Sequence, residues 1–103
     1  MQQAKFAIGE IIHHVLFNYR GVIFDVDFKY LGSDEWYQQV ALSRPPKNQP
    51  WYHVLVDNGS HQTYVAEQNL EPSDIATPVR HPLIDQFFVR LENGVYIPRS
   101  RNN

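Results

Sequence analysis

Histidines have the widest range of site chemistry in this sequence, because a neutral imidazole can ligate a metal ion and titrates near neutral pH. There are five: His13, His14, His53, His61 and His81. His13 and His14 are adjacent, so in a strand they point to opposite faces and cannot reach one ion. No HxH or HxxxH spacing occurs. A zinc site would need ligands from distant parts of the chain, so we expect histidines on strand surfaces or in the core, and no metal.

Carboxylates are the second group that could carry chemistry. Asp25 and Asp27 stand two residues apart in an extended segment, which places them on one face about 6.6 Å apart. A carboxylate pair at about this separation can supply the acid and base of glycoside hydrolysis. Carboxylates on the wet face of an amphipathic strand are ordinarily solvated, so we expect these two to be surface residues.

Other catalytic patterns are missing from the sequence. No serine stands in a nucleophile elbow, and the five glycines are isolated, so no phosphate-binding loop is formed. The absence of cysteine excludes thiol nucleophiles, disulfides and thiolate metal sites. We therefore expect a protein that is not an enzyme and has no catalytic residues and no cofactor.

Short strands and turns must position these residues. Apolar side chains occupy alternate positions at Val22, Phe24, Val26 and Phe28. The opposite face would carry Ile23, Asp25, Asp27 and Lys29. This period of two predicts a strand with one dry and one solvated face. With residues 10–16 it forms a hairpin whose turn, at 17–21, uses Asn18 or Gly21 at positive φ.

Two further hairpins follow along the chain. Residues 51–56 and 62–67 flank Asn58-Gly59, which favours a type I′ turn. Residues 87–91 and 95–97 flank Asn93-Gly94, and Pro98 ends that hairpin.

One segment follows a helical pattern instead. Residues 33–42 begin with Ser33 as N-cap, and Trp36, Val40 and Tyr37 share a face. Prolines mark residues 43–50 and 71–82 as loops. The sequence predicts a mainly β fold, a small barrel or partly open sandwich with one short helix, in a single domain over residues 1–103.

Composition bounds the class of protein. The 43% hydrophobic and 14% aromatic shares argue against disorder. No apolar run approaches the roughly 20 residues of a membrane helix, and residues 1–6 lack the apolar stretch of a signal peptide. We expect a protein that does not enter a membrane. The absence of cysteine fits a reducing compartment, so we expect a cytoplasmic location.

Several strings resemble the heat-shock protein HspQ family, also called the hemimethylated-DNA-binding or YccV-like domain. The opening carries residues 5–10 (KFAIGE), His14, residues 19–23 (YRGVI), Asp25 and Asp27. The centre carries residues 50–56 (PWYHVLV) and 63–70 (TYVAEQNL), and the tail carries residues 81–83 (HPL) and 96–98 (YIP). The matches extend from residue 5 to about residue 98 and define the expected core. Residues 28–49 depart from the usual short acidic and proline-rich run of the family.

The resemblance implies a small, bent SH3-like β-barrel without catalytic residues. Two activities are attached to the family. One is binding to hemimethylated DNA. The other is a heat-shock role in which the protein promotes degradation of clients, including the replication initiator DnaA, by the Lon protease. Self-association as a trimer is also attributed to relatives. An interaction barrel with an unrelated partner and no DNA binding is the alternative.

The distribution of charge bears differently on DNA binding and protein binding. The net charge is −2, and residues 79–103 are the only part of the chain with a net positive charge. We therefore expect DNA binding to be weak and salt-dependent. The candidate DNA contacts are Lys5, Arg20, Arg80, Arg90, Arg99 and Arg101. A protein adaptor needs no basic field: it needs a partly apolar patch with aromatic anchors, or an unpaired sheet edge to which a strand of the partner is added. The candidate partner contacts are Tyr19, Trp36, Trp51, Tyr52 and Phe88, of which Tyr19 is expected to be partly exposed because it stands in a turn.

Overall fold

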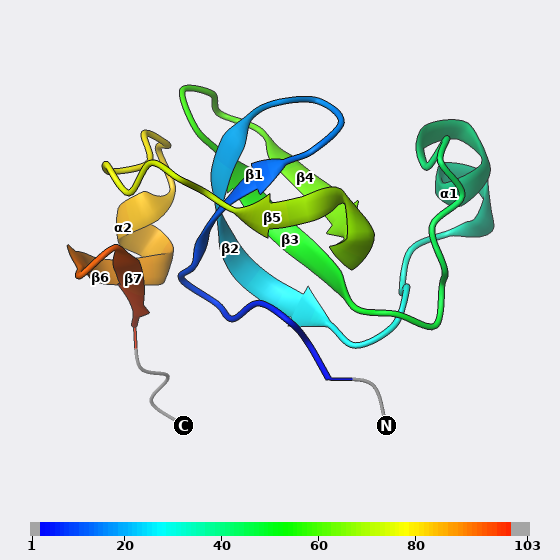
Figure 1. Cartoon of the computed structure of the whole chain (residues 1–103), viewed down its shortest axis with the longest axis horizontal. Helices are drawn as coiled ribbons and strands as arrows, with labels where there is room; N and C mark the ends of the chain where they lie inside the picture. Colours follow the sequence, from blue (N-terminus) through cyan, green and yellow to red (C-terminus); the bar gives the residue numbers. More distant parts are fainter. Residues whose placement is uncertain (1–2, 100–103) are drawn as a thin grey trace.

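The computed structural model describes residues 3–99, and its elements are mainly strands (Figure 1). They are β1 (Ile11–His14), β2 (Arg20–Asp27), α1 (Asp34–Val40), β3 (Trp51–Val56), β4 (Gln62–Ala66), the 3-10 turn η1 (Glu67–Asn69), β5 (Leu70–Pro72), α2 (Ile84–Phe87), β6 (Phe88–Glu92) and β7 (Val95–Pro98). The predicted mainly β class is confirmed. In the described part of the chain, no helix has the length and apolar character needed to cross a membrane.

The strands form one curved antiparallel sheet and one separate ribbon. The sheet order is β4-β3-β2-β1-β5, and β6 pairs only with β7. The sheet is not closed: β4 and β5 occupy its two edges and are joined through η1. The expected barrel is therefore present as a bent, open sheet. In Figure 1, α1 lies at one end of this sheet and α2 with the β6–β7 ribbon lies at the other.

Gly9 joins the ribbon to the sheet. Its N–H donates to the carbonyl of Ile23 at 2.8 Å, and its own carbonyl accepts from the N–H of Tyr96 at 2.8 Å. Gly9 has a φ of +98°, and a Cβ there would lie 2.1 Å from the Tyr96 carbonyl oxygen. Only glycine fits this junction, because a side chain would meet both the φ penalty and the clash.

The prediction of a single apolar face along β2 is wrong, because the strand contains a bulge. The register against β3 shifts between Ile23 and Asp25. Ile23 and Val26 pack on one face of the sheet, whereas Phe24 packs on the other. Phe28 is 62% exposed. The alternation inverts at the bulge because one extra residue there turns the following side chains to the opposite face.

Three groups of buried residues form the core. The inner cluster contains Phe6, Ile12, Ile23, Tyr52, Val54, Val65 and Leu70. The outer cluster, under the ribbon, contains Ile11, Val22, Leu55, Val79, Phe88 and Tyr96. The aromatic cluster, under α1, contains Tyr37, Ala41, Trp51 and Ala66, with Tyr30, Trp36 and Tyr64 packed against them. β3 contributes to all three clusters, so both of its faces are covered.

The helix α1 begins as predicted, but of the three residues predicted to share a face only Tyr37 is buried. Ser33 is the N-cap, and its Oγ accepts a hydrogen bond from the N–H of Trp36 at 3.1 Å. Tyr37 is the buried residue of the helix and its hydroxyl donates to the Pro45 carbonyl at 2.7 Å, whereas Val40 is 53% exposed. A seven-residue helix makes too few turns for its apolar spacing to define the buried face. The single-turn α2, η1 and the three-residue β5 were not predicted.

The turn residues were predicted well at Asn18 and less well elsewhere. Asn18 has a φ of +56°, whereas Gly21 lies within β2. At the second hairpin only Asn58 takes a positive φ, of +63°, and a longer loop closes where the Val56 N–H donates to the His61 carbonyl at 3.3 Å. The paired positive φ values of a type I′ turn occur instead in the third hairpin, at Asn93 and Gly94.

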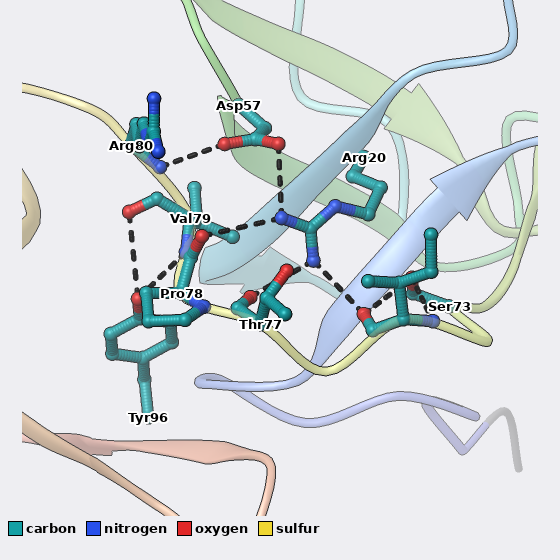
Figure 2. A network of polar contacts seen from close by, with 9 residues as sticks. Arg20, Asp57, Ser73, Thr77, Pro78, Val79, Arg80 and Tyr96 are labelled. Atoms are coloured by element: carbon teal, nitrogen blue, oxygen red, sulfur yellow. Dashed lines mark hydrogen bonds and ion pairs between the residues drawn. The ribbon is translucent and has the colours of Figure 1, made fainter.

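Arg20 fastens the long connection between β5 and α2 to the sheet (Figure 2). Its guanidinium donates to the carbonyls of Ile75, Thr77 and Pro78 at 2.9–3.3 Å. It also pairs with Asp57 at 3.0 Å, and the two side chains are only 15% and 12% exposed. The other Asp57 oxygen accepts from the N–H of Arg80 at 2.7 Å. This pair therefore fixes the path that brings Val79 into the outer cluster.

We predict that Arg20→Leu lowers the free energy of unfolding by about 2–4 kcal/mol, because it leaves the Asp57 carboxylate without its partner in a mostly buried site. The control is Arg90→Leu, which removes an exposed ion pair with Glu92 and costs less than about 1 kcal/mol. Urea unfolding of both variants measures the difference. Equal losses would contradict the structural role of Arg20.

Candidate functional site

The predicted DNA-contacting residues are dispersed, and several are engaged within the protein. Arg20 is held by Asp57 and backbone carbonyls, so its guanidinium is engaged within the protein, and its assignment as a DNA contact stays a prediction. Arg90 pairs with Glu92 at 2.6 Å, and the Nε of Arg99 donates to the Asp85 carbonyl at 2.6 Å. Lys5 and Arg80 are exposed. Arg101 lies outside the described residues.

The predicted partner-contacting aromatics divide into core and surface. Trp51, Tyr52 and Phe88 are 1%, 0% and 1% exposed. The strands β3 and β6 direct these side chains into the three core clusters, so they offer no exposed anchor in this structure, and their assignment as partner contacts stays a prediction. Tyr19 is half-buried, as expected for a turn residue, and its hydroxyl is 2.7 Å from Thr63 Oγ1. Trp36 is also half-buried, at the edge of the aromatic cluster.

Tyr19 and Trp36 lie on opposite sides of a groove of about 610 Å³. One wall is the β1–β2 loop, with Leu16 and Phe17, and the other is the end of α1, with Val40 and Leu42. Residues of β4 form the floor between them. We call this hollow the β4 groove.

The walls of the β4 groove carry apolar side chains in contact with solvent. Phe17 and Leu42 are 72% and 75% exposed, and Leu16 is 57% exposed. Sequence reasoning missed these residues. The available signal was the presence of two large apolar side chains, Leu16 and Phe17, at the turn between the first two strands, where solvated residues are usual.

A polar group lies beside the groove on β2, β3 and β4. Asp27 Oδ2 accepts hydrogen bonds from Tyr64 at 2.7 Å and from His53 Nε2 at 3.0 Å. Burial raises the pKa of the Tyr64 hydroxyl above its usual range, and the hydrogen bond to Asp27 raises it further. The tyrosine is therefore a permanent donor rather than a general base. The group orients His53 and Tyr64, which both line the β4 groove.

In the described part of the chain, Asp25 lies close to Asp27 and His53, and side chains of these types can bind metal ions. The ligand atoms of Asp25, Asp27 and His53 lie within 4.8 Å of one another. Two of these side chains already bond each other, and Asp25 accepts from the N–H of Val26 at 2.9 Å. Internal hydrogen bonding accounts for this arrangement without an ion.

The loop that forms one wall of the groove is held by a buried histidine. His14 is 3% exposed, and its Nδ1 accepts hydrogen bonds from the N–H groups of Leu16 and Phe17, both at 3.1 Å. Its ring also stacks on Phe17 with a centroid separation of 4.7 Å. Burial lowers the pKa of His14, and the neighbouring His13 lowers it further. The wall therefore requires the neutral imidazole.

The adjacent histidine behaves in the opposite way. His13 bonds Asn18 at 2.6 Å and Glu71 at 2.7 Å, and these hydrogen bonds raise its pKa, that to Asn18 most. A raised pKa stabilises the fold below the unfolded value, an effect lost as the pH rises through the folded pKa. A lowered pKa acts with the opposite sign, so the contribution of His14 is complete above the unfolded value and declines as the pH falls below it.

We predict that an NMR titration of the two imidazoles separates them around the unperturbed value of 6.5. His13 titrates above this value and His14 below it. The amides of Leu16 and Phe17 keep their hydrogen bonds until His14 protonates, and their chemical shifts then move with the same midpoint. A His14 midpoint at or above 6.5 would contradict the described role of its Nδ1.

One comparison with known proteins bears on this arrangement. A family model described as "YccV-like: hemimethylated DNA-binding protein YccV like" matches residues 4–95 of the chain. The match covers every strand of the main sheet, the groove and the segment fastened by Arg20. It also confirms the resemblance seen in the sequence motifs. The chain belongs to the YccV-like family of hemimethylated-DNA-binding proteins.

Proposed function

We propose that this chain is a non-enzymatic, HspQ-like regulatory protein of the cytoplasm that promotes degradation of client proteins, such as the replication initiator DnaA, by the Lon protease. The β4 groove is the observation that carries this proposal. It offers exposed apolar side chains beside half-buried aromatics, which is the composition of a protein-binding surface. Trimeric self-association is a further prediction from the family.

The distribution of charge supports a protein partner over a nucleic acid for this surface. Among the described residues that line the groove, none is Asp, Glu, Lys or Arg. Affinity for DNA comes largely from cations that neutralise phosphates, and the groove offers none. A protein segment with apolar side chains needs no such field.

DNA binding is the second function, and family membership supports it. Among residues 3–99, the exposed candidates without an ion pair are Lys5, Arg80 and Arg99, and the Nε of Arg99 donates to a backbone carbonyl. A few phosphate contacts give weak binding at physiological salt. A hemimethylated site differs from a fully methylated one by a single methyl group, which is worth about 1 kcal/mol when buried, so discrimination by contact is about five- to tenfold.

We predict that adding the purified protein to Lon raises the degradation rate of DnaA. Leu42→Ser in the groove wall reduces the stimulation by about half or more, because it removes an exposed apolar contact. The matched control is Leu31→Ser, since Leu31 is 64% exposed but outside the groove lining. Unchanged rates across a panel of clients, with no complex in sedimentation, would leave an interaction barrel with an unrelated partner.

A separate prediction concerns DNA. Fluorescence anisotropy with hemimethylated and fully methylated duplexes gives weak binding, with a log–log salt slope of about −2 to −4 for a few phosphate contacts. Arg80→Gln makes this slope shallower by about one unit. Tight binding with a flat salt response would refute this description of the DNA contacts.

A further inference from the structure

The strand β4 forms one edge of the five-stranded sheet and also the floor of the β4 groove. A strand at an edge pairs on one side only, so half of its backbone groups point away from the sheet. These groups can pair with another extended chain. The question is which groups of β4 are free and what can reach them.

Hydrogen bonds at the two ends of the β3–β4 pair set its phase. The N–H of Val56 donates to the His61 carbonyl, and the N–H of Glu67 donates to the Pro50 carbonyl. In an antiparallel pair, residues with hydrogen bonds to the partner strand alternate with residues without them. The backbone N–H and C=O groups of residues 61, 63, 65 and 67 therefore point toward β3. Gln62, Tyr64 and Ala66 therefore direct their N–H and C=O groups toward the open edge.

The two ends of this edge differ in access. Ala66 is only 2% exposed, and the Nδ2 of Asn69 lies 3.5 Å from Ser43 Oγ, so that end is covered. Gln62 is exposed and Tyr64 is half-exposed. The accessible edge consists of the backbone groups of Gln62 and Tyr64, whose spacing of two residues matches only an extended partner.

The composition of β4 leaves this edge unguarded. Edge strands are usually protected by charged residues or proline. The other edge strand, β5, follows this rule with Glu71 and Pro72. The residues of β4 are Gln-Thr-Tyr-Val-Ala, which include neither. The groove walls, which include Phe17 and Leu42, flank this edge instead.

The walls define the chemistry of the strand that fits. Phe17 and Leu42 present exposed apolar side chains on the walls, and Gln62, Thr63 and Tyr64 on the floor offer uncharged polar groups. The described lining contains no Asp, Glu, Lys or Arg that would pair with a charged residue or a phosphate. An uncharged segment with alternating apolar side chains is complementary to this surface, and a nucleic acid is not.

We propose that the β4 groove binds an extended, uncharged, apolar peptide segment of a partner protein by adding it as a strand to β4, through the backbone groups of Gln62 and Tyr64. This inference deepens the proposed function, on which it rests for the identity of the partner. It gives a mechanism for recognising unfolded or extended segments without reading a strict sequence, because main-chain groups supply the hydrogen bonds.

The test uses a labelled peptide of alternating threonine and valine, and the same peptide with N-methylated backbone amides. We expect the unmodified peptide to bind and to slow hydrogen exchange at the amides of Gln62 and Tyr64 at least tenfold. The methylated peptide binds at least tenfold more weakly, because its edges lack donors. Equal binding of the two peptides, or exchange unchanged at both amides, would overturn strand addition.

Variants of the protein provide a second test. Gln62→Pro removes a donor that faces the open edge and leaves the ladder with β3 intact, so it weakens peptide binding at least tenfold with a normal circular dichroism spectrum. Phe17→Ser weakens binding, whereas the control Phe28→Ser, at a 62% exposed residue outside the groove, does not. Equal effects of the two Phe variants would overturn the proposed walls.

Two outcomes separate this inference from the proposed function. Peptide binding at β4 without any effect on degradation by Lon leaves the inference standing and removes the proposed function. If degradation is stimulated but the amides of Gln62 and Tyr64 are not protected by the peptide, the proposed function stands and strand addition is overturned. Protection of these amides without peptide, rising with protein concentration alongside a dimer in sedimentation, would assign the edge to a second copy and overturn the proposal.

Discussion

The whole structure depends on the burial of both faces of β3. Tyr52 and Val54 pack into the inner cluster, Leu55 packs under the C-terminal ribbon, and Trp51 packs under α1. A small sheet cannot cover both faces of its central strands by itself, so the chain before and after it must supply the cover. The bulge in β2, the Gly9 junction and the Arg20 contacts are the local means by which it does so.

Sequence patterns predicted the hairpins because strand alternation and Asn-Gly turns are local properties. The Ser33 cap and the three hairpin pairs were found in this way. The bulge at Ile23–Asp25 was not, since its effect depends on pairing with β3, which lies far along the chain. The sequence allowed a partly open sheet but did not show which strands would lie at its edges, because the order of the strands depends on pairing between distant segments.

The candidate site was only partly predictable. Tyr19 and Trp36 were identified by residue type and position, and both line the groove. The engagement of Arg20 was not visible, because its partners are carbonyls more than 50 residues away, to which no side-chain pattern points. Arg20, a candidate DNA contact, instead stabilises the fold, whereas the apolar side chains of Leu16 and Phe17 remain exposed to solvent.

The Arg20 contacts have a consequence for how this protein can change over time. Three of the four groups that the guanidinium holds are main-chain carbonyls, of Ile75, Thr77 and Pro78, which every amino acid provides. Neutral substitutions can therefore accumulate along this stretch without altering its route. Arg20 and Asp57 have no such freedom, because their side chains make the contacts. Homologous chains should therefore differ in the segment around residues 75–78 and retain Arg20 and Asp57.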